Sequence, residues 1–455
     1  MSANRALLAL SAALLLGACA PLPPPGVSQA PAPPAATATP GTTPATATPE
    51  APARPGPLRL DGEPSIEVGL VWDADSLAFA AVKPQLTWRV GRAHDRAAGR
   101  EERLRVVVAA GRAELRANGH ALASLGSGDT LWLGEPEDGA ANPDPQLAWN
   151  GRTWRGQAKV FVNVRHTLTL ALRLPLEGYL AGVVPGEIGG LSDAVLEAGR
   201  AQAVAARSYT LFYRGRRGAE GFDVYGSVED QVYGAVETER PFATQCVETT
   251  RGELALWDGA PIRANYCSTC GGITADVWEA FPAASLPYLR STRDRDGGAD
   301  WCQRSPQYRW REEWDADDFV ATVARFAPPE GIRLPSAALG ALIDVRVAAR
   351  SRSARVWRLE IETSAGVIAV PAYAVRRVLR RPGEPHAILR SDLFKIDVLR
   401  DPATHRALRV VASGAGSGHG VGLCQTGALG MAQAGRSADQ ILEHYYPGAT
   451  LKKLY

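Results

Sequence analysis

The sequence lacks a charge imbalance and several motifs that mark common enzyme classes. Its 455 residues include 50 lysines and arginines against 48 aspartates and glutamates, which gives a formal net charge of +2. No nucleic-acid partner is predicted, because the chain offers no basic field to hold phosphates. It also has no H-E-x-x-H zinc motif, no G-x-S-x-G elbow and no G-x-G-x-x-G or G-K-[ST] phosphate loop. These absences argue against zinc hydrolases, α/β-type serine hydrolases and nucleotide-binding enzymes.

The N-terminus has one apolar run, which is too short to span a bilayer as a mature helix. Residues 1–19 combine Arg5 with apolar residues up to Leu16, a pattern typical of a signal peptide. The run ends in "LGAC", which resembles the lipobox of bacterial lipoproteins and implies lipidation of Cys19. With Ala20 next, the resemblance implies an exported lipoprotein on the periplasmic face of the outer membrane. An ordinary signal peptide with an unmodified cysteine is the alternative.

The rest of the chain divides into a tether and at least two folded regions. Residues 20–57 are almost wholly Pro, Ala and Thr, so they predict an extended tether of roughly 3 Å per residue. Residues 58–150 predict a β-rich N-terminal region, and residues 151–455 a second domain. The β-type runs continue to about Leu174 and are SIEVGLVW, QLTWRV, RLRVVVAA, DTLWLG, RGQAKVFVNV and TLTLALRL.

One long helix is predicted in "LSDAVLEAGRAQAVAARSYTLFYRG", with Ser192 as N-cap and Gly215 or Gly218 as the stop. Small side chains recur on two neighbouring faces, which predicts a buried helix whose polar residues Gln202 and Arg207 need partners. With the strands before it, this helix predicts an α+β fold.

Further elements are predicted toward the C-terminus. Residues 315–326 predict a helix and residues 343–374 return to a β pattern. Ser437 and Gln440 form a capping box for a last helix, which residues 447–448, Pro-Gly, end.

Cysteine usage fits an exported protein. Once Cys19 is set aside, five cysteines remain, an odd number, so at least one should stay free or bind something. The pair Cys267 and Cys270 has the Cys-x2-Cys spacing of half a zinc site or a redox pair. No second such pair occurs, and we expect a disulfide from Cys267 or Cys270 to Cys302. The remaining two cysteines are Cys246 and Cys424.

The segment "VVPGEI" places one carboxylate, Glu187, at the end of an apolar stretch. One interpretation is structural: Pro185 and Gly186 form a turn that ends a strand, and Glu187 favours the N-terminus of the next helix. The other interpretation is chemical. Apolar neighbours would raise the pKa of Glu187 and keep a proton ready for a glycosidic oxygen at neutral pH.

A second unusual residue is His419, which lies among the glycines of "GAGSGHGVG". Glycines allow close backbone approach and unusual dihedral angles. The alternatives are a functional loop and a structural loop with a solvated histidine.

Five ordered blocks resemble the stage II sporulation protein D (SpoIID/LytB) family. They are "PLEGYLAGVVPGEI", "EAGRAQAVAARSYTL", "DQVYGA", "YCSTCGGITADVWEAF" with "PYLRS", and "GHGVGLCQTGALGMAQAG" with "ILEHYYPGATL". The resemblance covers most of the chain after about residue 150. It implies a mixed α/β catalytic domain with a central buried helix.

The resemblance implies peptidoglycan glycan strands as the partner and lytic transglycosylase activity, preferably on strands without stem peptides. Glu187 would be the general acid and base, with no second carboxylate. The implied substrate-binding residues are Gln202, Arg207, Ser208, Tyr209, Gln231, Tyr233, Ser268, Thr269, His419 and Gln425.

The sequence departs from the family pattern at two places. Some members carry a His and Cys zinc motif before the "QVYGA" block, but "DVYGSVEDQVYGA" has neither residue. No cofactor or metal site is therefore predicted there, and zinc elsewhere stays open. Cys267 stands where a histidine is expected, which argues against a catalytic role for that side chain.

Two other functions stay open. Some relatives are enhancers of a cell-wall amidase, which implies a peptidoglycan-binding activator without hydrolytic activity. The third interpretation is a glycan-binding module tethered to the membrane by its N-terminal lipid. Cell separation or glycan turnover is the expected role.

Overall fold

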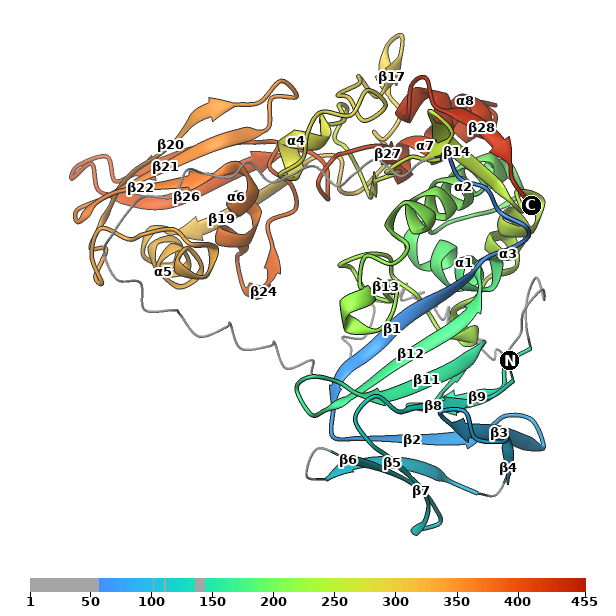
Figure 1. Cartoon of the computed structure of the whole chain (residues 1–455). Helices are drawn as coiled ribbons and strands as arrows, with labels where there is room; N and C mark the ends of the chain where they lie inside the picture. Colours follow the sequence, from blue (N-terminus) through green and yellow to red (C-terminus); the bar gives the residue numbers. More distant parts are fainter. Residues whose placement is uncertain (1–56, 101, 110–111, 136–143) are drawn as a thin grey trace, which may run out of the picture. The chain divides into compact units, whose positions relative to one another are not determined.

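The computed structural model describes residues 57–100, 102–109, 112–135 and 144–455. The predicted signal peptide with Cys19, and the predicted tether except its last residue, lie outside the described residues. The described chain has a mixed α+β fold in which a β-rich N-terminal region precedes a region of helices and short sheets, as predicted (Figure 1). No helix in the described part has both the length and the apolar character needed to cross a membrane.

The β-rich region forms two sheets, and each of the six predicted segments contains a strand. The strand order is β13-β1-β12-β11-β8-β3-β4 in the larger sheet and β10-β9-β2-β5-β6-β7 in the smaller one. The larger sheet joins β1 to β12 in antiparallel register from Ser65 opposite Pro175 to Ala74 opposite Leu168, so it combines strands from both sides of residue 150. The bounds are β1 Ser65–Ala74, β2 Ser76–Ala81, β3 Gln85–Val90, β4 Arg96–Gly99, β5 Leu104–Ala109, β6 Arg112–Ala117, β7 His120–Leu125, β8 Thr130–Leu133, β9 Leu147–Trp149, β10 Arg152–Trp154, β11 Gln157–Val162, β12 Leu168–Pro175 and β13 Val224–Tyr225.

The VVPGEI segment is helical, which corrects the expected strand and turn. Helix α1 (Leu176–Glu187) follows β12 directly and contains Pro185. Every residue from Leu176 to Val184 is buried, so the segment has no 3.6-residue apolar period and reads like a buried strand. Glu187 therefore ends a helix, and the interpretation of a carboxylate at a helix N-terminus is wrong.

Helix α2 (Leu196–Tyr213) is the buried helix predicted from its small side chains. Thirteen of its residues are buried. The expected N-cap is wrong, because Ser192 instead precedes a 3₁₀ turn (Asp193–Val195) and its side chain makes no capping bond. Gly215, with φ of 78°, follows the end of the helix. The elements in contact with α2 include α1, α3 (Pro241–Thr249), α7 (Gln425–Gln433), α8 (Ala438–Tyr445) and β14 (Glu253–Trp257) (Figure 1).

Residues 310–412 supply a second hydrophobic core, built around Phe319, Leu359 and Val375. The predicted helix at residues 315–326 is confirmed as α5 (Ala316–Phe326). The predicted β region is confirmed up to Pro371, where α6 (Ala372–Val378) begins. The strands of this region are β19 Trp310–Asp315, β20 Leu342–Arg350, β21 Val356–Thr363, β22 Gly366–Pro371, β23 Arg380–Arg381, β24 Glu384–Ile388, β25 Phe394–Arg400 and β26 Ala407–Gly414.

The C-terminal segment packs into the first hydrophobic core, which also contains the β-rich region and α2. The capping box of Ser437 and Gln440 is present at the start of α8. Strand β28 then pairs with β14, and β27 pairs in parallel with β16. The remaining short elements of the chain are β15 Ala260–Pro261, β16 Tyr266–Cys267, α4 Val277–Ala280, β17 Arg295–Asp296, β18 Ala299–Asp300, β27 Leu423–Cys424 and β28 Thr450–Lys453.

Candidate functional site

The last turn of α1 is held against the "DQVYGA" segment, which fixes the position of Glu187. The Gly234 N–H donates to the Gly182 carbonyl over 3.0 Å. A Cβ on Gly182 would lie 2.5 Å from the Tyr233 ring and 2.7 Å from the Gly234 oxygen, so glycine is required for this approach. The Val232 N–H then donates to Glu187 Oε1 over 2.9 Å. One carboxylate oxygen is thus anchored by backbone.

Burial raises the pKa of Glu187 above its ordinary value of 4.5. The hydrogen bond from Val232 opposes this shift, and so do the Gln425 amide and the Tyr266 hydroxyl nearby. The Gln425 Nε2 atom makes no hydrogen bond of normal geometry among the described residues. The carboxylate also lies at the negative end of the α1 dipole, which disfavours its ionised form further. No cation or second carboxylate of the described chain contributes to the shift.

Tyr266 connects Glu187 to a buried amide. Its hydroxyl accepts a hydrogen bond from Gln231 Nε2 over 2.9 Å. Gln231 Oε1 accepts in turn from Thr210 over 2.6 Å and from Tyr179 over 3.2 Å. Gln231 is fully buried, so it orients Tyr266 and offers no polar atom to solvent. Tyr266 was missed from the sequence, although it lies in the quoted "YCSTC" block.

Arg207 forms a buried ion pair at the other end of α1. Its Nε and Nη2 atoms donate to the two oxygens of Glu177 over 2.8 and 2.6 Å. Arg207 is 0% exposed and Glu177 is 3% exposed. Ser208, also fully buried, donates to the Val204 carbonyl and accepts from the Ala255 N–H, which joins α2 to β14. In this structure both predicted groove residues support the core instead of facing a ligand.

Three more predicted groove residues of the α1 and α2 region are also buried. Gln202 is 0% exposed, and neither its oxygen nor its nitrogen has a hydrogen-bond partner among the described residues. The Tyr209 ring lies 4.6 Å from that of Tyr213, centroid to centroid. Tyr233 packs on Tyr179 at 5.2 Å. Of this group, only the tyrosines retain a small exposed fraction.

Ser268, Thr269 and Gln425 lie where the loop after β16 meets the start of α7. Ser268 is exposed and is the most accessible of the predicted residues. Thr269 is buried, with its hydroxyl 2.8 Å from that of Ser305 and 3.0 Å from that of Thr426. The structure thus brings Gln425 to Glu187 and leaves Ser268, which precedes the buried Thr269, at the surface.

His419 has the environment of a structural histidine. The Val421 N–H donates to its Nδ1 atom over 3.0 Å, so that nitrogen carries no proton. Burial, followed by the charges of Arg376, Arg263 and Arg355, lowers the pKa of His419 to about 3. The imidazole is therefore neutral at physiological pH and unsuited to act as a charged acid.

The predicted disulfide is absent. Each of the five described cysteines is a free thiol. Cys270 and Cys302 do approach each other, with their sulfur atoms 3.7 Å apart, but a disulfide needs about 2.05 Å. The other candidate, Cys267, lies outside the group of thiols to which Cys270 and Cys302 belong.

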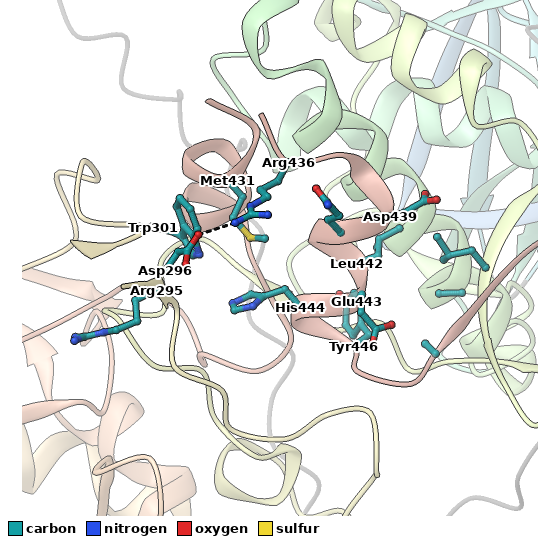
Figure 2. Close-up of a pocket in the computed structure, with 14 residues that line it drawn as sticks. Arg295, Asp296, Trp301, Met431, Arg436, Asp439, Leu442, Glu443, His444 and Tyr446 are labelled. Carbon is teal, nitrogen blue, oxygen red and sulfur yellow. Dashed lines mark hydrogen bonds and ion pairs between the residues drawn. The ribbon is translucent and has the colours of Figure 1, made fainter. Parts of the chain in front are cut away.

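A cavity of about 670 Å³ lies beside α8 (Figure 2). Its lining includes Trp301, Arg436 and His444, and an ion pair joins Arg436 to Asp296 over 2.6 Å. Neither Glu187 nor any predicted groove residue lines it. The cavity is therefore separate from the candidate site at the end of α1.

Comparisons with known proteins cover the segment that contains Glu187. Residues 164–257, which carry α1 and α2, match the family model of SpoIID, the stage II sporulation protein. The chain carries a SpoIID domain in this segment. Residues 295–422 match a second model, described only as a domain of unknown function.

Three relatives give the extent of the similarity. An uncharacterized protein of Brachyspira hyodysenteriae is 27% identical over 306 residues, which is 66% of this chain and 73% of that protein. Stage II sporulation protein D of Bacillus subtilis is 26% identical over 62% of this chain and 75% of its own length. The amidase enhancer of Bacillus subtilis is 26% identical over 60% of this chain, but the match spans 40% of the enhancer.

Proposed function

We propose that the protein is a peptidoglycan lytic transglycosylase in which Glu187 is the general acid and base. The observation that carries the proposal is the environment of Glu187: a partly buried carboxylate at a helix C-terminus, with a raised pKa and no cation beside it. Such a group keeps its proton closer to neutral pH than a solvated carboxylate does. The family and the relatives named for sporulation and for amidase enhancement support a cell-wall substrate.

In the first half of the reaction, protonated Glu187 donates its proton to the glycosidic oxygen as the bond from C1 to that oxygen breaks. Oε1 is held by the Val232 N–H, so Oε2 is the oxygen available to the sugar. The Gln425 amide and the Tyr266 hydroxyl lower the pKa of Glu187, which stabilises the carboxylate once the proton has left.

In the second half, the muramoyl 6-hydroxyl attacks C1 and gives its proton to the Glu187 carboxylate. The product carries a 1,6-anhydro ring, water is not consumed, and Glu187 is protonated again. A single carboxyl group therefore completes the cycle, unlike the paired carboxylates of glycosidases that use water. The lack of a second carboxylate among the causes of the Glu187 shift fits this scheme.

Mass spectrometry of the reaction products tests the proposal. The full chain and Glu187→Gln would each be incubated with glycan strands that carry stem peptides and with strands from which an amidase has removed them. We expect fragments ending in anhydro-muramic acid from the wild type alone, and more of them from the denuded strands. Intact strands from a folded wild type would overturn the proposal.

The second candidate is a non-catalytic activator of a cell-wall amidase, favoured by the similarity to an amidase enhancer. Adding a purified amidase to the same strands separates the two functions. An activator raises amidase turnover equally with wild type and Glu187→Gln, and a transglycosylase forms anhydro ends without amidase.

We also propose that the chain acts at the outer membrane, anchored by a lipid on Cys19 and spaced from it by residues 20–57. The support is the "LGAC" sequence and the Pro, Ala and Thr composition that follows it. Metabolic labelling with a radioactive fatty acid, with Cys19→Ser as the control, tests the anchor.

A further inference from the structure

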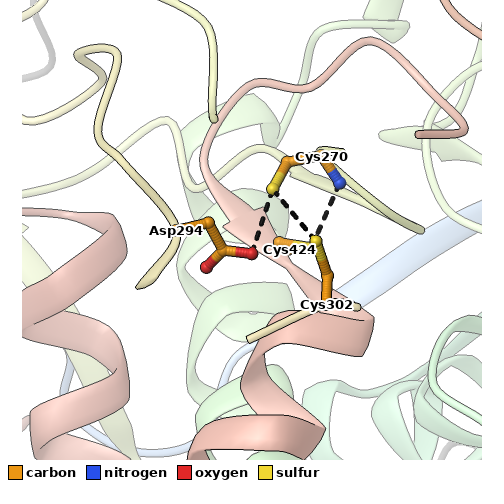
Figure 3. A group of neighbouring side chains, drawn as sticks. All are labelled: Cys270, Asp294, Cys302 and Cys424. Carbon is orange, nitrogen blue, oxygen red and sulfur yellow. Dashed lines mark hydrogen bonds between the residues drawn. The ribbon is translucent and has the colours of Figure 1, made fainter. Parts of the chain in front are cut away.

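Four side chains converge in the interior of the protein, and Glu187 is not among them. They are Cys270, Asp294, Cys302 and Cys424, here called the cysteine cluster (Figure 3). One ligand atom from each lies within 4.8 Å of the others. All four residues are at most 1% exposed.

We propose that the cysteine cluster is a structural zinc site with three thiolate ligands and one carboxylate ligand. Structural zinc is bound by four protein ligands in a tetrahedron, with cysteine sulfur and carboxylate oxygen among the accepted types. The site differs from the His and Cys motif expected before "QVYGA", because its residues come from three other segments of the chain.

The distance between two of the sulfur atoms matches a tetrahedral zinc site. With Zn–S bonds of about 2.3 Å, two thiolates on one zinc ion lie about 3.8 Å apart. The Cys270 and Cys302 sulfurs are 3.7 Å apart. Asp294 Oδ2 lies 3.0 Å from the Cys270 sulfur, so the carboxylate points at the same centre (Figure 3).

The surroundings orient the ligands and offset their negative charge. The peptide N–H groups of Cys270 and Gly427 donate to the Cys424 sulfur over 3.2 and 3.3 Å, and the second of these belongs to the first turn of α7. The Gly272 N–H donates to the Cys270 sulfur over 3.4 Å. Hydrogen bonds to coordinating thiolates and the positive end of a helix both stabilise such a site.

Asp294 is also supported from outside the cluster. Its Oδ1 atom accepts from the Tyr445 hydroxyl over 2.6 Å and lies 3.6 Å from His444 Nε2. Gly427 leaves the room for this, since a Cβ there would lie 2.7 Å from Asp294 Oδ2. Outer partners of this kind fix the orientation of a ligating carboxylate.

A disulfide explains fewer of these contacts. A bond between Cys270 and Cys302 would use two thiols and leave Cys424 and Asp294 directed at it without a role. Zinc binding uses all four groups, involves no change of oxidation state and releases the thiol protons to solvent. It also places a cation against Asp294, a buried carboxylate whose partners include Tyr445, His444 and the Cys270 thiol.

The site would fasten three segments, two of which carry predicted substrate-binding residues. Cys270 follows Ser268 and Thr269, Cys302 and Asp294 flank the β17–β18 hairpin, and Cys424 precedes Gln425. Because Gln425 directly follows the ligand Cys424, the zinc ion would hold the start of α7 in position. The inference on zinc holds for an enzyme and for a non-catalytic activator alike.

Metal content is the first test. The full chain would be purified without chelators or metal-affinity resin and measured by inductively coupled plasma mass spectrometry. We expect about one zinc ion per chain in the wild type and in Cys246→Ser. Cys246 is the matched control, a buried cysteine whose thiol donates to the Leu196 carbonyl outside the cluster. Cys302→Ser, Cys424→Ser and Asp294→Asn should lose most of the metal.

Two results would overturn the inference. One is a Cys270–Cys302 disulfide in unreduced peptide digests of wild type that holds no stoichiometric metal. The other is equal zinc content in Cys302→Ser and Cys246→Ser.

A measurement on the wild type alone covers the case in which the cluster variants do not fold. Protein produced in cobalt-supplemented medium should show the visible bands of tetrahedral Co²⁺ and near-ultraviolet charge transfer from thiolate to cobalt. A chelator should lower the melting temperature of the zinc protein by roughly 5 °C or more. Metal-loaded protein without thiolate bands, or an unchanged melting temperature after complete metal removal, would contradict a structural zinc site.

Discussion

Helix α1 carries two carboxylates at opposite ends, and their surroundings differ in almost every respect. Glu177 lies in the first turn, where the helix dipole favours a negative charge. It receives two hydrogen bonds from Arg207, and others from the Gly252 N–H and the Tyr455 hydroxyl. Glu187 lies at the opposite end, where the dipole opposes its charge, and it has one backbone donor and no cation.

The difference indicates that one end of α1 stabilises the fold and that the other end is suited to proton transfer. The Glu177 carboxylate is surrounded by donors, and its removal would leave Arg207 buried and unpaired. The Glu187 carboxylate has fewer hydrogen-bond donors and no cation. Its ionised form is therefore disfavoured, and its pKa is raised. The first arrangement stabilises the fold. The second destabilises the charged form of Glu187, and shifted pKa values of this kind are common at functional sites.

The largest expected effect is the loss of activity in Glu187→Gln. Removal of a general acid and base lowers the rate by about 10²- to 10⁴-fold, because glutamine cannot donate or accept the proton. Release of anhydro-ended fragments over time measures it. Glu229→Gln is the matched control, because Glu229 is an exposed carboxylate of the loop before "DQVYGA" and should keep wild-type activity. Equal activity in both variants would assign the chemistry to another residue.

The second effect concerns the other end of α1. Arg207→Leu should lower the free energy of unfolding by about 3 to 5 kcal/mol, because it leaves Glu177 charged, buried and without its cation. Urea denaturation measures the loss. The double variant Glu177→Leu with Arg207→Leu should lose less than the two single variants summed. A single variant as stable as wild type would show that the ion pair does not hold this end of the helix.

A smaller effect is expected where α1 meets the "DQVYGA" segment. Gly182→Ala places a methyl group against the Tyr233 ring and the Gly234 oxygen, which should cost about 1 to 3 kcal/mol and displace Glu187 from Val232. Thermal unfolding and activity should therefore fall together. The control is Gly218→Ala, where a Cβ meets nothing within 4 Å. Similar behaviour of the two variants would mean that the approach at Gly182 is not tight.

The smallest effect links the Glu187 pKa to stability. Because the pKa is raised on folding, the contribution of the protonated carboxyl is fully present below 4.5 and is lost as the pH rises through the folded pKa. Glu187→Gln cannot ionise, so it should melt above wild type at neutral pH. The two melting curves should converge in acid. A variant that melts below wild type at neutral pH would contradict a desolvated carboxylate.

Much of the fold could be predicted, because alternating patterns and helix signals are local. The six β segments and helix α5 lie where the sequence places them. VVPGEI was misassigned because α1 is buried on every side, so its apolar run carries no period to separate helix from strand. The N-cap was misplaced because Ser192 begins a 3₁₀ turn before α2.

The site was harder to predict, because it depends on contacts between distant segments. A polar residue in a helix of small side chains indicates that it needs a partner, but not whether it is buried. The sequence therefore singled out Arg207 without showing that it pairs with Glu177. The backbone N–H of Val232 that donates to Glu187 cannot be predicted from the types of side chain in the sequence. The cysteine cluster was missed because Cys424 is 154 residues from Cys270, and because the sequence did not distinguish Cys267 from Cys270 as the neighbour of Cys302.

The central claim is that its surroundings raise the pKa of Glu187, and a direct titration tests it. Wild type and Glu187→Gln, both with ¹³C-labelled glutamate side chains, would be compared by NMR across the acidic and neutral range, so that the Glu187 carboxyl signal is identified by difference. We predict a midpoint clearly above 4.5. A midpoint at or below that value would contradict the assignment of Glu187 as a proton donor.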